Sequence, residues 1–180
     1  TIQNYLADQK IWPRLSTDLP EFAEAEKAVG AEIDRLMGIK GKRSVDSIHK
    51  ELGHIMWEYV GMGRTAEGLK TGLDKIKKLR KEFETNLFIL GTKEGLNTEL
   101  DKAITMGELI AYDALSRNES CGGHFREEYQ TEEGEAKRDD ENYFYVGCWE
   151  YQGSDEKAPE LIKEPLEYEA IKVQTRNYKD

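Results

Sequence analysis

The sequence predicts a mainly α-helical protein: an antiparallel three-helix bundle of the spectrin-repeat type, with one preceding helix and an extended C-terminal arm of about two β-strands. Three observations support this fold class. Segments between residues 20 and 117 repeat apolar residues at the three- and four-residue steps of amphipathic helices. The last three segments are joined by short links, which force successive helices to run in opposite directions. After residue 117, charged turns and aromatic, β-branched runs replace the helical period.

The first helix is expected from about Pro20 to Met37. Thr17 supplies a candidate N-cap side chain, and Pro20 and Glu21 suit the first turn of a helix. Gly38 then allows the chain to turn. The apolar stripe of this helix consists of Phe22, Ala25, Val29, Ile33 and Leu36.

The second helix is expected to begin after Ser44 and to end near Gly61. The third follows the cap Thr65 and continues to Gly91. Their stripes are Val45, Ile48, Leu52, Ile55, Met56 and Tyr59 in the second helix, and Leu69, Leu73, Ile76, Phe83, Leu87 and Leu90 in the third.

The fourth helix is expected from about Glu94 to Arg117. Its small residues should let a neighbouring helix approach closely. The stripe of the fourth helix is Leu96, Leu100, Ala103, Gly107, Ile110 and Ala114.

In the third helix Arg80 interrupts the apolar seam, so Leu79 is expected to share the burial.

The C-terminal arm begins with a glycine turn at 121–123 and a highly charged stretch at 127–141. Residues 143–151 and 166–173 are predicted as strands, since aromatic and β-branched residues favour extended structure. The expected domain division is 1–43 for the end of a preceding domain and a connecting helix, 44–117 for the bundle, and 118–180 for the loop and arm packed on it.

Composition limits the partners. The formal charge of −10 opposes binding to nucleic acid and to anionic lipid headgroups. No apolar run approaches the roughly 20 residues of a membrane helix, and residues 1–10 lack the pattern of a signal peptide. We therefore expect a soluble, cytoplasmic chain without direct membrane contact and without nucleic acid as a partner.

No catalytic, cofactor-binding or metal-ligating residue is predicted in this chain. Cys121 and Cys148 are the only cysteines and are expected to be reduced and metal-free. His49 and His54 are five residues apart on a helix, which turns their side chains about 140° away from each other. The sequence contains no glycine-rich dinucleotide motif, phosphate loop or nucleophile elbow.

One loop gathers functional side chains. Residues 120–128 carry His124 and Arg126 around a glycine pair, and Arg138 and Asp139 follow. Such a loop suits a polar seam between domains. The alternative is a loop tied to the bundle by salt bridges of Arg126. As members of an exposed loop, His124 and Arg126 are expected to contribute no more than about 1 kcal/mol each to the stability of this chain alone.

These loop motifs resemble a known family. Residues 119–127, Glu-Ser-Cys-Gly-Gly-His-Phe-Arg-Glu, and 138–142, Arg-Asp-Asp-Glu-Asn, are similar to the Glu-Ser-Arg-Gly-x-His-x-Arg and Arg-Asp-Asp-x-x-Trp signatures near the C-terminus of succinate dehydrogenase and fumarate reductase flavoprotein subunits. The resemblance covers nearly the whole chain and includes Asn86, Leu96, Leu100, Ala114, Leu52, Met56, Trp57, the segments 61–64 and 164–166, and 175–178.

The resemblance has two departures. Cys121 stands where the common motif has arginine, and Tyr143 lies where tryptophan is frequent. Contacts made through that arginine are therefore not carried over. The Cys-Gly-Gly-His-Phe-Arg form resembles a branch that works with menaquinone and a diheme cytochrome b anchor. L-Aspartate oxidase and adenylylsulfate reductase carry a similar helical appendage.

The resemblance implies that this chain is the C-terminal module of such a subunit, with residues 1–6 as the tail of its flavin domain. The parent would bind FAD and interconvert succinate and fumarate by hydride transfer. Its partners would be its own flavin and capping domains, an iron–sulfur subunit and a cytochrome b anchor, at the inner face of the cytoplasmic membrane. The chain alone would hold no cofactor and be inactive. Its interdomain docking residues would be Ser120, His124, Arg126, Arg138 and Asp139.

Two other readings stay open. The first is a free-standing helical adaptor that binds a partner through the acidic loop and aromatic strands. The second is a small metal enzyme, which the shortage of ligands disfavours.

Overall fold

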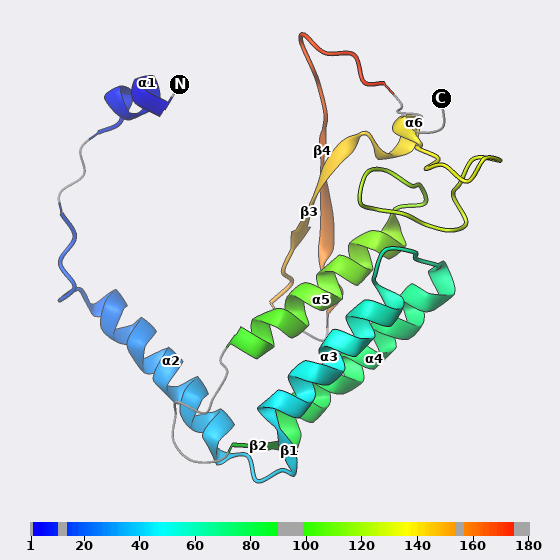
Figure 1. Cartoon of the computed structure of the whole chain (residues 1–180). Coiled ribbons are helices and arrows are strands. Elements are labelled where there is room, and N and C mark those ends of the chain that lie inside the picture. Colours follow the sequence, from blue (N-terminus) through cyan, green and yellow to red (C-terminus); the bar gives the residue numbers. More distant parts are fainter. Residues whose placement is uncertain (1, 11–13, 90–98, 154–156, 175–180) are drawn as a thin grey trace. The chain divides into compact units, whose positions relative to one another are not determined.

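The computed structural model describes residues 2–10, 14–89, 99–153 and 157–174 (Figure 1). It divides the chain into two compact units, Thr1–Gly38 and Ile39–Asp180. The bundle and the C-terminal arm belong to the second unit. The expected mainly α-helical class, with short strands near the C-terminus, is confirmed. The expected division at residues 43 and 117 stays a prediction.

The first unit contains α1 (Ile2–Asp8) and α2 (Pro20–Gly38). The helix expected at residues 20–37 is therefore confirmed. The turn before it is organised by Ser16, whose Oγ accepts the Asp18 N–H at 3.1 Å. Phe22 and Val29 of the predicted stripe remain exposed, at 46% and 61%.

The second unit is built on α3 (Val45–Tyr59) and α4 (Ala66–Thr85). The predicted cap Thr65 is confirmed, and Ser44, after which the second helix was expected to begin, caps α3. The Ser44 hydroxyl accepts the Ser47 N–H at 3.2 Å, and the Thr65 hydroxyl accepts the Gly68 N–H at 3.0 Å. These bonds satisfy amides that a helix leaves unpaired in its first turn.

The prediction that the third helix continues to Gly91 is wrong, because α4 ends at Thr85. The Asn86 carbonyl accepts the N–H groups of Lys42 and Arg43 at 3.0 and 2.9 Å. Strand β2 (Leu87–Phe88) then pairs in parallel with β1 (Arg43–Ser44). The pairing of Leu87 with Arg43, 44 residues earlier in the sequence, thus replaces further helix after Thr85. It does so although the helical period of apolar residues continues. Leu90 lies outside the described residues.

Helix α5 (Glu99–Ser116) completes the bundle. Residues 94–98, where this helix was expected to begin, lie outside the described part of the chain. Its buried stripe differs from the predicted one, since Ile110 is 40% exposed and Ala103 is half-buried. The residues that face the core are Leu100, Ile104, Gly107, Ala111 and Ala114.

The rotation of α5 is set by a close approach to α3. A Cβ atom on Gly107 would lie 3.0 Å from the Met56 sulfur and 3.6 Å from a Leu52 methyl. The prediction that small residues let a neighbour approach is therefore confirmed at this position.

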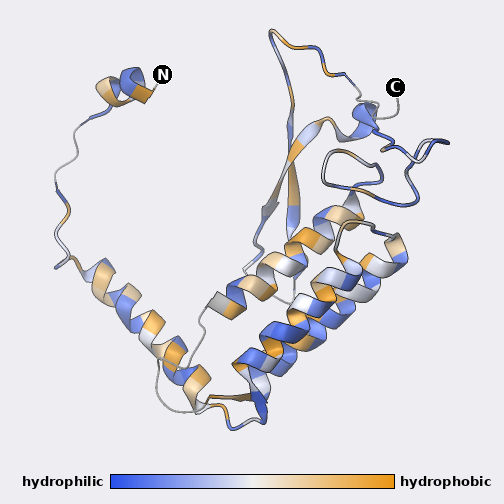
Figure 2. Cartoon of the chain, in the orientation of Figure 1, coloured by the Kyte–Doolittle hydropathy of each residue, from blue (hydrophilic) through white to orange (hydrophobic). Residues whose placement is uncertain are grey.

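The core lies between the three helices, along which apolar and hydrophilic stretches alternate (Figure 2). Leu79 is 1% exposed, as predicted. Arg80, beside it, is 7% exposed and pairs with Glu108 at 3.2 Å and Asp101 at 3.4 Å. No helix among the described residues is long and apolar enough to cross a membrane.

The C-terminal arm is an antiparallel ribbon of β3 (Tyr145–Glu150) and β4 (Glu160–Pro165), preceded by the short helix α6 (Asp140–Tyr143). The first predicted strand is confirmed. The second, expected at 166–173, is wrong, because the partner strand comes from the segment interpreted as a connector. Pro165 already pairs with Tyr145, the first residue of β3. The Leu166 N–H still donates to the Phe144 carbonyl at 3.2 Å, and the residues after it run past the end of the ladder.

One face of the ribbon packs on α5 (Figure 1). The Trp149 indole N–H donates to Asp113 Oδ1 at 3.1 Å, and its ring lies 6.4 Å from the Tyr112 ring. Alternate residues of β3 are therefore half-buried, while Val146 and Cys148 point outward.

Candidate functional site

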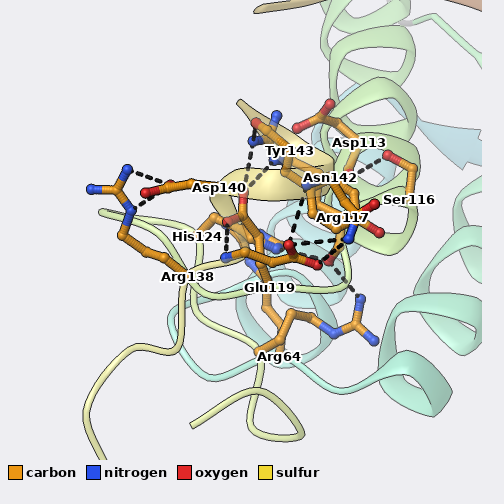
Figure 3. A network of polar contacts seen from close by, with 12 residues as sticks. Arg64, Asp113, Ser116, Arg117, Glu119, His124, Arg138, Asp140, Asn142 and Tyr143 are labelled. Atoms are coloured by element: carbon orange, nitrogen blue, oxygen red, sulfur yellow. Dashed lines mark hydrogen bonds and ion pairs between the residues drawn. The ribbon is translucent and has the colours of Figure 1, made fainter. Parts of the chain in front are cut away.

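The polar loop folds back over the C-terminal end of α5 and against the turn between α3 and α4 (Figure 3). Its tip is a tight turn in which Cys121 and His124 exchange backbone hydrogen bonds of 2.8 and 3.0 Å. Gly122 has a φ of +58°, a conformation that favours glycine. The glycine pair of the sequence motif therefore serves to turn the chain.

Arg126 is buried in the chain, with 2% exposure. Its Nη1 donates to the carbonyls of Ala114 at 3.0 Å and Arg117 at 3.4 Å, and its Nε donates to Glu128 at 3.1 Å. The last carbonyls of a helix lack intrahelical partners and carry partial negative charge, so a guanidinium there is stabilising. The expectation that Arg126 lies on an exposed loop is wrong.

Ser120 is also buried. Its hydroxyl accepts the Arg126 N–H at 2.8 Å and donates to the Arg126 carbonyl at 3.1 Å, while its own N–H donates to Lys137 at 2.9 Å. Ser120 therefore holds the two sides of the loop together.

His124 connects two arginines. Its Nδ1 lies 3.0 Å from Arg64 Nη1, and its Nε2 lies 3.1 Å from the Arg117 carbonyl. A guanidinium only donates and a carbonyl only accepts, so the ring is neutral and carries its proton on Nε2. Burial lowers the pKa of His124, and the hydrogen bond to the Arg117 carbonyl offsets this only in part. The nearby charge of Arg64 lowers that pKa further.

Arg117 and Glu119 link the loop to the C-terminal arm. Arg117 Nη2 donates to Glu119 Oε1 at 2.7 Å and to the Tyr143 carbonyl at 2.8 Å. Glu119, 2% exposed, accepts the Asp139 N–H at 3.0 Å through its other oxygen. Burial opposes the charge of Arg117, but the hydrogen bond and attraction of Glu119 outweigh it and raise its pKa.

Arg138 and Asp139 lie at the surface of this network. Arg138 pairs with Asp140 at 2.5 Å, and the Asp139 side chain caps α6 by accepting the Asn142 N–H at 3.2 Å. The hydrogen bond to Asp140 raises the pKa of Arg138. Both residues line a surface pocket of about 350 Å³, whose other lining residues are Asn118, Tyr129 and Lys137.

The structure therefore brings the five predicted docking residues into one network, but in different positions. Ser120 and Arg126 face inward, His124 is half-buried, and Arg138 and Asp139 line the pocket.

Sequence reasoning missed three members of the site: Arg64, Arg117 and Glu119. Arg64 lies just after Gly61, where the second helix is predicted to end. The Arg64 N–H donates to the Phe125 carbonyl at 3.2 Å, and its carbonyl accepts the Glu127 N–H at 2.8 Å. A charged residue in a glycine turn is the only local signal of this pairing.

These residues do not fit a flavin or a metal. The sequence lacks a glycine-rich dinucleotide loop, and Arg117 and Arg126 are committed to carboxylates and helix carbonyls. Within the part of the chain that the structure describes, no group of three or more His, Cys, Asp or Glu side chains is placed to hold a metal ion. The arrangement supports packing and recognition.

The fold and the loop define a helical module completed by a polar loop and a β-ribbon. Residues 49–178 match the family described as fumarate reductase flavoprotein C-term. This chain belongs to that family, as the motifs at 119–127 and 138–142 predicted.

Individual relatives are consistent with this family assignment. The fumarate reductase flavoprotein subunit of Proteus vulgaris is 31% identical over 178 residues, which are 93% of this chain and 28% of that protein. L-Aspartate oxidase 2-b of Nicotiana tabacum is 39% identical over 86 residues, which are 46% of this chain and 13% of that protein. The chain thus spans about a quarter of the length of the fumarate reductase relative.

The fold is also found in a solved structure. A quinol-fumarate reductase with menaquinol molecules superimposes with a TM-score of 0.70 at 24% identity, and the match covers 88% of this chain and 27% of that chain. At this identity the likeness concerns the fold.

Proposed function

We propose that this chain is the structural C-terminal module of a succinate dehydrogenase or fumarate reductase flavoprotein subunit. The observation that carries the proposal is that the charged side chains of the loop form their hydrogen bonds within this chain. His124, Arg117 and Arg126 bond to carbonyls and side chains of the module itself. Groups committed in this way stabilise a fold and are not free to bind a dicarboxylate.

The catalytic parts are proposed to lie in the remainder of the subunit, since the chain spans about a quarter of its relatives. That remainder would bind FAD, which would accept a hydride from succinate or donate one to fumarate and so interconvert the two. The relatives named as fumarate reductase flavoprotein subunits support this assignment.

The proposed partners are an iron–sulfur subunit and a cytochrome b anchor, which would place the assembly at the inner face of the cytoplasmic membrane. The fold similarity to quinol-fumarate reductase supports this proposal.

The proposed role of the polar loop is to dock the module on the flavin domain of the same subunit. Arg138 and Asp139 would make direct contacts from their pocket. Ser120, Arg126 and His124 would act by holding the loop in shape, because their polar groups are used inside the chain.

A second candidate is the equivalent module of an L-aspartate oxidase. It is favoured by the tobacco relative, which has the higher identity over a shorter segment. The whole subunit discriminates the two, since it should oxidise either succinate or L-aspartate.

The test is to purify this chain and the whole subunit in parallel. We expect the chain to be folded, colourless and inactive, and the whole subunit to carry a flavin absorbance band and reduce a dye with succinate. A flavin band in the chain alone, or succinate-dependent dye reduction by it, would contradict the proposal.

A further inference from the structure

We propose that a carboxylate-bearing segment of the remaining flavoprotein subunit covers the seam between α3 and α5, with Arg64 as its charged anchor. This inference rests on the proposed function and names a second contact face, distinct from the Arg138 pocket. We call it the seam surface, and its residues are Gly53, Trp57, Met62, Arg64, Met106 and Ile110.

The first observation is the charge state of Arg64. Its Nε donates to the Val60 and Gly61 carbonyls at 3.1 and 2.9 Å, and Nη1 donates to His124. These bonds hold the guanidinium in place without neutralising it. Burial lowers the pKa of Arg64, the charge of Asp113 opposes this, and Arg126 lowers it further.

Arg64 differs from the other arginines between Arg35 and Arg138 in having a positive charge that no carboxylate of the described residues neutralises. Every other arginine from Arg35 to Arg138 forms an ion pair with a carboxylate. Among the described residues, none provides a carboxylate within ion-pair distance of Arg64. A half-buried cation without an anion is costly, so this position fits a carboxylate supplied from outside the chain.

The second observation is which face of α3 is open. Met56 faces α5, where it approaches Gly107. Successive residues of a helix are rotated by about 100°. Leu52 and Ile55 lie to one side of Met56 and are buried in the core, so Trp57 must lie to the other side. It is 87% exposed.

Helix α5 has an open face of the same kind. Ile104 and Ala111 lie to one side of Gly107 and are buried. Met106 and Ile110 lie to the other side and are 58% and 40% exposed.

Helices α3 and α5 both run antiparallel to α4, so they are parallel to each other (Figure 1). Because the core residues of both helices turn toward α4, Trp57, Met106 and Ile110 come to the same side of the seam, away from α4. Gly53, one turn before Trp57, has open space where a Cβ would be. Met62 follows in the turn that leads to Arg64 and is 90% exposed.

Tryptophan, methionine and arginine are the residue types enriched in the centres of protein interfaces. A chain with a formal charge of −10 repels an acidic partner over most of its surface. The unneutralised Arg64 at the end of an apolar strip is therefore a specific site for a carboxylate flanked by apolar side chains. The occupant comes from the same subunit, because about three quarters of the relatives' length lies outside this chain.

Hydroxyl-radical footprinting tests this directly, since Trp and Met side chains react readily when exposed. The 180-residue chain and the whole subunit are oxidised under the same dose, and each site is quantified by mass spectrometry. We expect Trp57, Met62 and Met106 to react in the chain alone and to lose most of their reactivity in the whole subunit. Tyr151, which is exposed and directly follows β3, serves as the comparison site.

A matched pair of variants tests the anchor. Arg64→Gln in the whole subunit should restore much of the reactivity of Trp57 and Met62. Arg43→Gln removes an arginine that already pairs with Glu51, and it should not. Circular dichroism of both variants in the isolated chain verifies that each still folds.

A whole subunit that carries flavin and turns over succinate, yet leaves Trp57 and Met62 as reactive as in the chain alone, would overturn the inference and leave the proposed function standing. Protection that develops in the isolated chain as its concentration rises would also overturn it, because the occupant would then be a second copy. Flavin content and turnover of the same preparation report separately on the proposed function.

Discussion

Arg126 Nη1 lies 3.0 Å from the Ala114 carbonyl, at the last turn of α5. This bond lets a side chain from the polar loop terminate a bundle helix. Arg126 Nε donates to Glu128 at 3.1 Å, and the other oxygen of that carboxylate accepts the Ala66 N–H, in the first turn of α4, at 2.5 Å. One arginine thereby connects the ends of two helices through the loop.

Arg126→Ala should therefore destabilise the isolated chain by about 2–3 kcal/mol, because it leaves helix carbonyls and a carboxylate without their donor. This replaces the expectation of about 1 kcal/mol that followed from an exposed loop. Urea unfolding followed by circular dichroism measures the difference. Arg138→Ala is the control, and its surface pair with Asp140 should be worth no more than about 1 kcal/mol. Equal effects of the two substitutions would contradict the buried role of Arg126.

His124 makes the stability depend on pH. Its pKa in the folded chain lies below the ordinary value of 6.5, so the folded state favours the neutral ring. The unfolded chain then binds the proton more readily, and the contribution of His124, fully present above pH 6.5, is lost as the pH falls toward the folded pKa. The melting temperature of the wild type should fall more steeply between pH 7.5 and 5.5 than that of His124→Gln. Parallel curves for the two proteins would show that another group titrates.

Two glycines should respond in opposite ways to alanine. A Cβ on Gly41 would lie 1.9 Å from the Asn86 carbonyl carbon, so Gly41→Ala must displace backbone and should cost about 2–3 kcal/mol. Gly53 lies inside α3 with nothing within 4 Å of its Cβ position, so Gly53→Ala should stabilise the isolated chain by about 0.5–1 kcal/mol. Chemical denaturation of both variants measures the change in the free energy of unfolding. A Gly41→Ala protein as stable as the wild type would argue against the β1–β2 pairing.

The ribbon is predicted to depend on Trp149. Trp149→Phe keeps an aromatic ring but removes the N–H that donates to Asp113, which should cost about 1 kcal/mol. Trp149→Ala should release the ribbon from α5 because the packing on Tyr112 is lost as well. Hydrogen exchange would then show faster exchange in β3 and β4, while the amides of α3 and α4 keep their protection. Uniform loss of protection over both regions would mean that bundle and ribbon unfold together.

Local signals predicted the helices well. The helix starts after Ser44 and Thr65 are predictable because each hydroxyl bonds to an amide three residues away, an interaction contained in a short stretch of sequence. The loop motifs also indicated the family, which residues 49–178 confirm. Pairing between segments far apart in the sequence could not be predicted from such local signals. The end of α4 depends on residues 42–43, and β4 is selected by its register against β3.

The sequence by itself determined the helical class, the starts of α3 and α4 and the family, because apolar period, capping chemistry and motif order are properties of neighbouring residues. Only the tertiary structure decided which polar side chains form hydrogen bonds and ion pairs within the chain. Arg126 and Arg64 both lie in or beside glycine-bearing turns, and composition does not distinguish them. Folding buries Arg126 on the end of α5 with its carboxylate partner. It leaves Arg64 half-buried beside His124, with no carboxylate partner among the residues that the structure describes. Which of two similar charges is neutralised depends on distances between segments 60 residues apart, and these exist only in the folded chain.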